Sequence, residues 1–193
     1  MSESEITKLC RRIYRKHQHA LDMIYEHRPD LQEEIRIVLE DLVKESDGLI
    51  LAHSTKTYVR FFPTEWDVPA LKINETESSS EQLLLFYFKN EQNRLRLRLV
   101  IGSGETEVVH RLFEMADEKA SSTPLQTFYK EPNQKQNTIF LKPILESNQY
   151  EDVSVDELEQ KIRKAWEVFL ERELPAIKIA LKEQDWIWEG EEA

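Results

Sequence analysis

The sequence predicts an α+β protein with an antiparallel sheet of about five strands, flanked by an N-terminal helical hairpin, a middle helix and a long kinked C-terminal helix. Apolar residues recur with the 3.6-residue period of a helix near both ends of the chain, and with a period of two residues, typical of strands, in the middle. The segments of period two follow one another closely enough to pair as hairpins. Helices grouped near the ends, with hairpins between them, favour a sheet covered on one face.

Two helices are predicted at the N-terminus. The first covers about residues 1–27, and Cys10 falls on its apolar stripe, which predicts a buried and inert thiol. Pro29 suits the first turn of a second helix over residues 30–45. Lys44 near the end of that helix matches the helix dipole. Because the two helices are joined so closely, we expect an antiparallel helical hairpin.

The predicted strands form two hairpins and one further strand. The turn of the second hairpin is placed at residues 90–93, and a helix is expected over residues 105–119. The five expected strands are residues 48–53, 57–62, 83–89, 94–101 and 138–145.

The last predicted helix begins at Ser154, which has Glu157 three residues further on in the pattern of a capping box. Pro175 is expected to kink or divide this helix. An acidic tail is expected from about residue 184. Its two tryptophans, Trp186 and Trp188, either pack against the rest of the domain or face a partner. Since neither an internal repeat nor a clear linker divides the 193 residues, we predict a single domain over residues 1–193.

Composition narrows the class of protein. A net charge of −11 argues against a protein that coats DNA by bulk electrostatics. The single cysteine excludes an intramolecular disulfide, and the polar N-terminus lacks an export signal, so a cytoplasmic location is expected. Neither a membrane span nor a cofactor is expected, and the five histidines lack the spacing of metal ligands.

The alternation of arginine and leucine over residues 94–99 is the most distinctive local pattern. In a strand it places Arg94, Arg96 and Arg98 on one face, about 7 Å apart, a spacing suited to a phosphate backbone. The alternative is an exposed sheet face whose arginines pair with neighbouring carboxylates. We call Arg94, Arg96 and Arg98 the arginine stripe. Three further basic residues would extend it if the strands lie in the right order: Arg60, Lys72 and Lys89.

Two other segments are candidate anion-binding sites. Arg11, Arg12 and Arg15 lie off the apolar stripe of the first helix, although a solvated helix face explains them as well. The residues 102–104 (GSG) precede a helix, where N–H groups can bind an anion. They lack the lysine of a phosphate-binding loop, which favours a tight strand-to-helix turn instead.

Three segments carry a resemblance to a known family: residues 58–67 (YVRFFPTEWD), 84–90 (LLFYFKN) and 97–104 (LRLVIGSG). In residue character and in their order along the chain they resemble the C-terminal accessory region of bacterial PD-(D/E)XK nuclease-superfamily proteins. The resemblance covers about residues 12–182. The metal site of that superfamily needs an aspartate and a Glu-x-Lys motif on adjacent strands. Here residues 159–161 (EQK) fit the letters of the motif but lie in a predicted helix. The resemblance therefore implies the accessory region without the nuclease core, and without catalytic residues.

The preferred hypothesis is a non-catalytic accessory or recognition module that binds a protein partner or a nucleic-acid backbone. The resemblance suggests a link to a bacterial nuclease or phage-defence system. Two alternatives stay open: a metal-dependent hydrolase with a site built from scattered carboxylates, and a cytosolic protein-binding inhibitor that acts through its acidic surface. The oligomeric state is left open. The candidate binding residues are Arg94, Arg96, Arg98, Arg11, Arg12 and Arg15.

Overall fold

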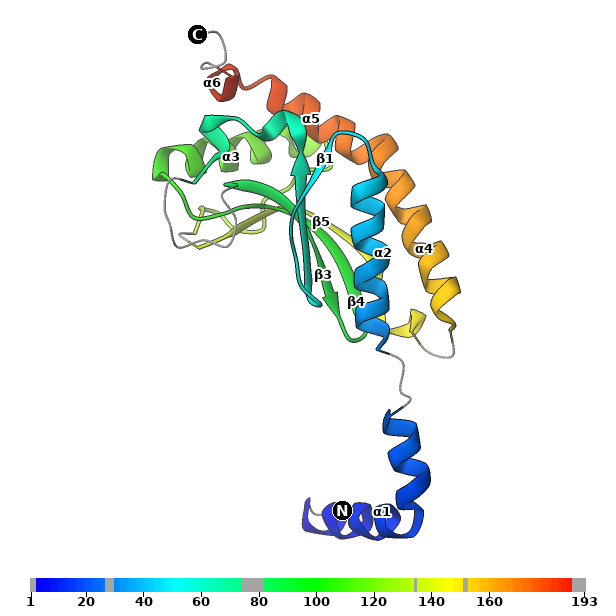
Figure 1. Ribbon diagram of the computed structural model, residues 1–193. Coiled ribbons are helices and arrows are strands. Elements are labelled where there is room, and N and C mark those ends of the chain that lie inside the picture. Colours follow the sequence, from blue (N-terminus) through cyan, green and yellow to red (C-terminus); the bar gives the residue numbers. More distant parts are fainter. Residues whose placement is uncertain (1–2, 27–29, 74–81, 134, 151–152, 189–193) are drawn as a thin grey trace. The chain divides into compact units, whose positions relative to one another are not determined.

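The computed structural model describes residues 3–26, 30–73, 82–133, 135–150 and 153–188 (Figure 1). The chain divides into two compact units, Met1–Asp30 and Leu31–Ala193. The second unit contains a five-stranded antiparallel sheet together with helices, so the predicted α+β class is confirmed. That the whole chain acts as a single domain stays a prediction.

The first unit is one helix, α1 (Glu3–Glu26), which is kinked at His17, where φ is −125° and ψ is 24°. The Tyr14 hydroxyl donates a hydrogen bond to Asp22 Oδ1 at 2.7 Å and joins the segments on either side of the kink. Cys10 is exposed, so the prediction of a buried thiol is wrong. An apolar stripe shows which side of a helix can be buried, but a single helix offers it nothing to pack against within its own unit. The exposed apolar side chains of α1 are Ile6, Leu9, Ile13, Tyr14, Met23 and Ile24.

The second unit begins with α2 (Leu31–Glu45), which buries Ile35, Leu39 and Leu42. These residues recur at spacings of three and four, as expected for a helix with one side in the core. Both N-terminal helices are therefore present, but they belong to different units. Their antiparallel packing as a hairpin stays a prediction.

All five strands pair with the next strand along the chain, and every pair is antiparallel. Because side chains alternate between the faces of a strand, this register gives the sheet two distinct faces. Phe61 opposes Phe86, and Phe86 opposes Leu99, on the face that builds the core. The strands are β1 (Leu49–Ser54), β2 (Tyr58–Pro63), β3 (Leu84–Glu91), β4 (Arg94–Ile101) and β5 (Asn137–Leu145).

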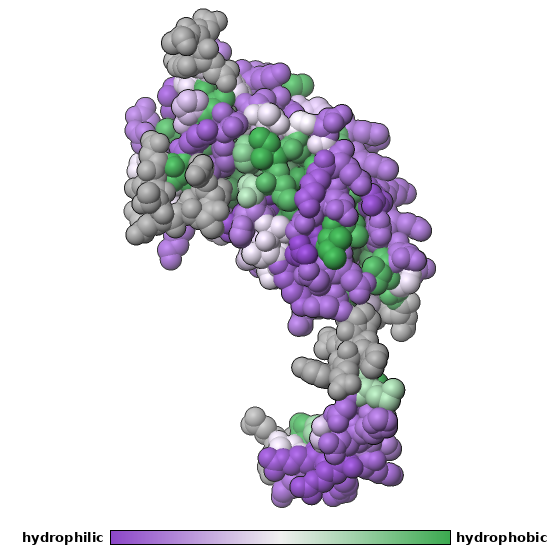
Figure 2. Space-filling view, in the orientation of Figure 1, coloured by the Kyte–Doolittle hydropathy of each residue, from purple (hydrophilic) through white to green (hydrophobic). Residues whose placement is uncertain are grey.

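Helices of the second unit cover the core face of the sheet, with α2 and α4 lying along one side of it (Figure 1). Their outer surface is mainly hydrophilic (Figure 2), as expected for amphipathic helices. The remaining helices are α3 (Thr106–Glu118), α4 (Val155–Val168), the π-helical turn η5 (Phe169–Glu173), α5 (Leu174–Lys182) and α6 (Asp185–Trp188). Short 3-10 turns occur at Thr64–Trp66, Pro69–Leu71, Lys119–Ser121 and Ser147–Gln149.

The core is built around aromatic rings. The rings of Phe61 and Phe86 stack with centroids 5.4 Å apart on neighbouring strands. Trp166 of α4 meets Phe61 edge-on at 5.4 Å, and Phe169 meets Phe86 in the same way at 5.2 Å. Full burial of such side chains stabilises the fold by about 1.5–3 kcal/mol each. The cluster therefore holds α4 and η5 against the core face of the sheet. These two elements do not cover the other face of the sheet.

The C-terminal helices follow the predicted signals. The Ser154 hydroxyl accepts a hydrogen bond from the backbone N–H of Glu157 at 3.3 Å, while the Glu157 carboxylate accepts one from the Ser154 N–H at 3.1 Å. The predicted capping box is therefore confirmed. Pro175 lies at the start of α5, directly after η5. A wider π-helical turn accommodates the missing N–H and the bulk of a proline ring, so the helix continues past it.

Residues 185–188, which the sequence analysis assigned to an acidic tail, form the short helix α6. Ile187 is buried in the core, the guanidinium of Arg111 lies 4.7 Å from the ring centroid of Trp186, and Trp188 Nε1 donates to the carbonyl of Leu181 at 3.2 Å. Both tryptophans thus dock on the body of the second unit. The last residues of the expected tail, 189–193, lie outside the described residues.

Tyr150 gives a prediction for alkaline pH. Burial, followed by the charge of Glu146, raises the pKa of the Tyr150 hydroxyl to about 12. A raised pKa favours the protonated phenol in the folded state. The contribution of the protonated Tyr150 hydroxyl to the free energy of unfolding is therefore complete below about pH 10, the ordinary pKa of tyrosine. It is lost as the pH rises toward 12. We expect an ultraviolet absorbance titration to show one tyrosine ionising about two pH units above the ordinary value.

Tyr150→Phe should remove that late phase, whereas Tyr129→Phe, which changes a tyrosine that is 60% exposed, should leave it. A late phase that persists in Tyr150→Phe would contradict the assignment.

Candidate functional site

The face of the sheet opposite the aromatic core, called the open face below, carries the side chains of Tyr58, Arg60, Tyr87, Lys89, Glu91, Arg94, Arg96 and Arg98. Arg60 opposes Tyr87, and Tyr87 in turn opposes Arg98, so these three side chains form one row across β2, β3 and β4. The next row contains Tyr58, Lys89 and Arg96. Directly opposed side chains start about 5 Å apart at Cβ, close enough to act on one ligand.

The strands themselves are strongly basic. They contain six lysines and arginines and one acidic residue, Glu91. Five of the six basic side chains lie on the open face. The sixth, Lys142 of β5, binds Glu173 of η5, with Nζ 2.6 Å from Oε2. Positive charge is therefore concentrated on one face of the sheet although the chain as a whole is acidic.

The two predicted neighbours on adjacent strands, Arg60 and Lys89, join the arginines of β4, because the strands lie in sequence order. Lys72 does not join them, and its predicted place in the stripe is wrong. It follows β2 outside the five strands, where its Nζ lies 2.9 Å from Asp67 Oδ1. Its backbone forms an isolated bridge with that of Gln82, outside the five strands.

The three predicted arginines of β4 are all half-buried, but their surroundings differ. Arg94 Nε lies 3.3 Å from Glu146 Oε2, which is the carboxylate pairing that the alternative interpretation expected. Arg98 Nη1 donates to the hydroxyl of Tyr87 at 3.4 Å. Within the described part of the chain, neither Arg96 nor Arg98 forms an ion pair within 4 Å. The end of the stripe nearest the β3–β4 turn is therefore partly neutralised, and the rest retains its charge.

Glu91 is held ionised by this cluster. A hydrogen bond from Lys89 lowers the pKa of the Glu91 carboxyl most, and the charges of Lys89, Arg96 and Arg94 lower it further. Lys89 Nζ lies 2.9 Å from Glu91 Oε1. Among the described residues, the five cations of the open face outnumber the two carboxylates near them, those of Glu91 and Glu146. The face therefore keeps a net positive charge at neutral pH.

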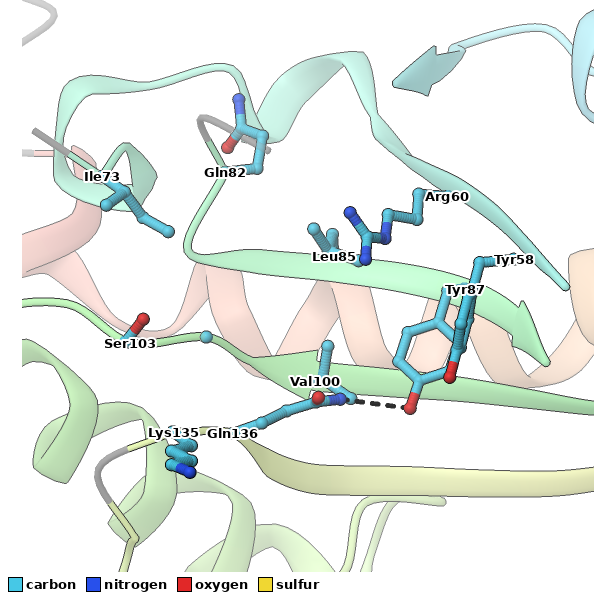
Figure 3. Close-up of a pocket in the computed structure, with 11 residues that line it drawn as sticks. Tyr58, Arg60, Ile73, Gln82, Leu85, Tyr87, Val100, Ser103, Lys135 and Gln136 are labelled. Carbon is cyan, nitrogen blue, oxygen red and sulfur yellow. Dashed lines mark hydrogen bonds between the residues drawn. The ribbon is translucent and has the colours of Figure 1, made fainter. Parts of the chain in front are cut away.

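A cavity of about 290 Å³ lies at the end of the Arg60–Tyr87–Arg98 row. Leu85 and Val100 are part of its apolar lining, and the two tyrosines stand side by side at one end of it (Figure 3). Gln136 points toward Tyr87 and donates from Nε2 to its hydroxyl at 3.1 Å. The described residues that line it are Tyr58, Arg60, Ile73, Gln82, Leu85, Tyr87, Val100, Gly102, Ser103, Lys135 and Gln136.

Sequence analysis missed the tyrosines of this cavity. Tyr87 stands between Phe86 and Phe88 in an unbroken apolar run, which is typical of a core strand. The ring of Tyr58 meets that of Tyr87 edge-on at 5.6 Å, and the guanidinium of Arg60 lies 5.8 Å from the Tyr58 ring centroid. The alternation of side chains along a strand could have identified them. Tyr58 lies two residues from Arg60, and Tyr87 two residues from Lys89, so each tyrosine shares a face with a basic residue of its own strand.

The GSG segment is a tight turn between β4 and α3, as predicted. A Cβ added at Gly104 would lie 2.6 Å from Cδ1 of Leu83, so a larger residue there would require the Leu83 side chain to move. A second cavity, of about 470 Å³, lies between this turn and the segment around Pro69 and Lys72. Glu105 lines it at the start of α3, where an acidic side chain complements the positive end of the helix.

Arg11, Arg12 and Arg15 are exposed on α1 in the first unit. The structure does not group them with the arginines of β4, which belong to the second unit. Their role in binding stays a prediction.

The carboxylates of the described residues do not gather into a metal site. No group of three histidine, cysteine, aspartate or glutamate residues among them is placed to hold a metal ion. Of the described residues that line the two cavities, one is a carboxylate, Glu105. Residues 159–161 lie in α4, as the sequence predicted. This arrangement offers little support for the hydrolase alternative, which needs two or more carboxylates converging in one cleft.

No helix among the described residues is both long enough and apolar enough to cross a membrane. In the comparisons with known proteins, no family model, curated protein or solved structure matches the chain. The resemblance to the accessory region of nuclease-superfamily proteins therefore stays a prediction.

Proposed function

We propose that this protein is a non-catalytic recognition module that binds the phosphate backbone of a nucleic acid on its open face. The observation that carries the proposal is the register of β2, β3 and β4, which places Arg60, Lys89, Arg96 and Arg98 on one face beside two tyrosines. A guanidinium offers two parallel N–H donors to phosphate oxygens, and this geometry makes arginine a common phosphate ligand.

The net negative charge of the chain affects how strongly the open face can attract a nucleic acid. A net charge of −11 repels a polyanion at long range, but at physiological ionic strength charges separated by more than about 8 Å are largely screened. Contacts on the open face are shorter than this. Binding is therefore expected to depend on local contacts and to weaken steeply with added salt.

The test replaces the three arginines of β4 together, as Arg94→Gln, Arg96→Gln and Arg98→Gln. A matched control removes the same charge from the helical side of the unit, where Lys161, Lys164 and Arg172 are exposed. Fluorescence anisotropy with labelled single- and double-stranded oligonucleotides would measure affinity across a range of salt concentrations.

We expect the strand variant to bind at least tenfold more weakly and to lose about 2 from the slope of log affinity against log salt, since each phosphate contact on a single strand contributes about 0.7. The helix variant should bind like the wild type. The proposal fails if the wild type binds neither oligonucleotide, or if the two triple variants weaken binding equally.

A further inference from the structure

We propose that the cavity beside Tyr58 and Tyr87 accepts one unstacked base of a single-stranded nucleic acid. The proposal rests on the function proposed above and adds what the cavity recognises. At about 290 Å³ it is at the small end of ligand pockets. It therefore has room for a single ring system next to the phosphate-binding face.

The walls suit the flat face of a base. Leu85, Val100 and Ile73 supply an apolar surface, and Tyr58 adds an aromatic ring that is only half-buried. The Arg60 guanidinium lies over that ring. Bases stack on aromatic rings and on arginine planes in proteins that bind single strands. The Tyr58 ring together with the nearby Arg60 guanidinium is therefore a platform on which a base can be placed.

The polar rim suits the edge of a base better than a bare anion. It contains two carboxamides, Gln82 and Gln136, and the hydroxyls of Tyr87 and Ser103. Carboxamides and hydroxyls both donate and accept hydrogen bonds, as base edges do, whereas an anion needs donors alone. Gln136 is already positioned by its bond to the Tyr87 hydroxyl. None of the described lining residues is a carboxylate.

The cavity is also connected to the arginine stripe. Tyr87 opposes Arg98 and accepts a hydrogen bond from its Nη1, so one residue belongs both to the cavity and to the row of cations. A backbone phosphate held at Arg96 and Arg98 places the attached nucleotide next to the cavity mouth. In a duplex the bases are stacked inside the helix and cannot enter, so the geometry points to a single strand.

The experiment blocks the cavity without changing the arginines. Tyr58→Leu removes the aromatic platform, and Ser103→Trp fills the cavity from its exposed rim. Ser121→Trp is the matched control at another exposed serine. Each variant and the wild type are titrated with a single-stranded oligonucleotide and with the same oligonucleotide made abasic throughout, and thermal unfolding verifies that the variants fold.

We expect the wild type to bind the abasic strand about tenfold more weakly than the intact strand, since stacking of one base is worth about that factor or more. Tyr58→Leu and Ser103→Trp should weaken binding of the intact strand by a similar factor and leave binding of the abasic strand unchanged. Ser121→Trp should bind both strands like the wild type.

Two results would overturn the inference and leave the proposed function standing. The first is equal wild-type affinity for intact and abasic strands, with the β4 arginine variant still impaired. The second is displacement of the strand by nucleoside monophosphates at concentrations close to that of the oligonucleotide, which would assign the cavity to free nucleotides. If the wild type binds no oligonucleotide, the proposed function itself fails.

Discussion

Phe86→Ala is expected to lower the free energy of unfolding by about 3–5 kcal/mol, because it opens a cavity at the centre of the aromatic core. The ring of Phe86 is fully buried and stacks on Phe61 and Trp66 at centroid distances of 5.4 and 5.5 Å. It also meets Phe169 edge-on, so the loss would loosen the attachment of η5 to the sheet. Denaturant unfolding followed by tryptophan fluorescence would measure the change.

The same substitution at Phe128, which is 43% exposed, serves as the control and should cost less than about 0.5 kcal/mol. Equal losses at the two positions would mean that the stacked cluster does not hold the sheet and helices together.

Asn90→Ala is expected to lower the free energy of unfolding by about 2 kcal/mol, because it removes two hydrogen bonds made by a fully buried side chain. Asn90 is fully buried, and its Nδ2 donates to the carbonyl of Gln32 at 2.7 Å and to that of Lys56 at 3.0 Å. One side chain thus ties the end of β3 to the start of α2 and to the β1–β2 turn. Thermal and denaturant unfolding would measure the loss.

Asn148→Ala, at an exposed asparagine in a 3-10 turn, is the matched control and should change stability by less than about 0.5 kcal/mol. If Asn90→Ala is as stable as Asn148→Ala, the hydrogen bonds of Asn90 add nothing to the fold.

Asn90 also marks the limit of what the sequence predicts about the fold. The α+β class and the capping box at Ser154 follow from patterns that are local in sequence. Asn90 was expected in the β3–β4 turn, since asparagine is typical of turns. Its partners are 58 and 34 residues away, and only the folded chain brings them to it. Cys10 shows the same limit, because a stripe on a helix does not reveal whether another element covers it.

The candidate site was predictable only in part, for a related reason. The alternation around Arg96 places three arginines on one face of any strand. That Arg60 and Lys89 join them depends on strand order and register, which the pattern of a single strand does not contain. Tyr58, Tyr87 and Gln136 come from three separate segments and meet only in the finished sheet. Their contribution to the cavity could therefore not be read from any one segment.

The sequential pairing of the strands has a consequence for how the protein folds. β1 with β2 and β3 with β4 form hairpins over short loops, so little chain entropy is lost in closing either of them. The 35 residues between Ile101 and Asn137, which include α3, form the longest connection between paired strands, so we expect β5 to join the sheet after the two hairpins. Gln136 precedes β5 directly, so the positive face forms with the early hairpins, while its cavity is completed only when the last strand is added.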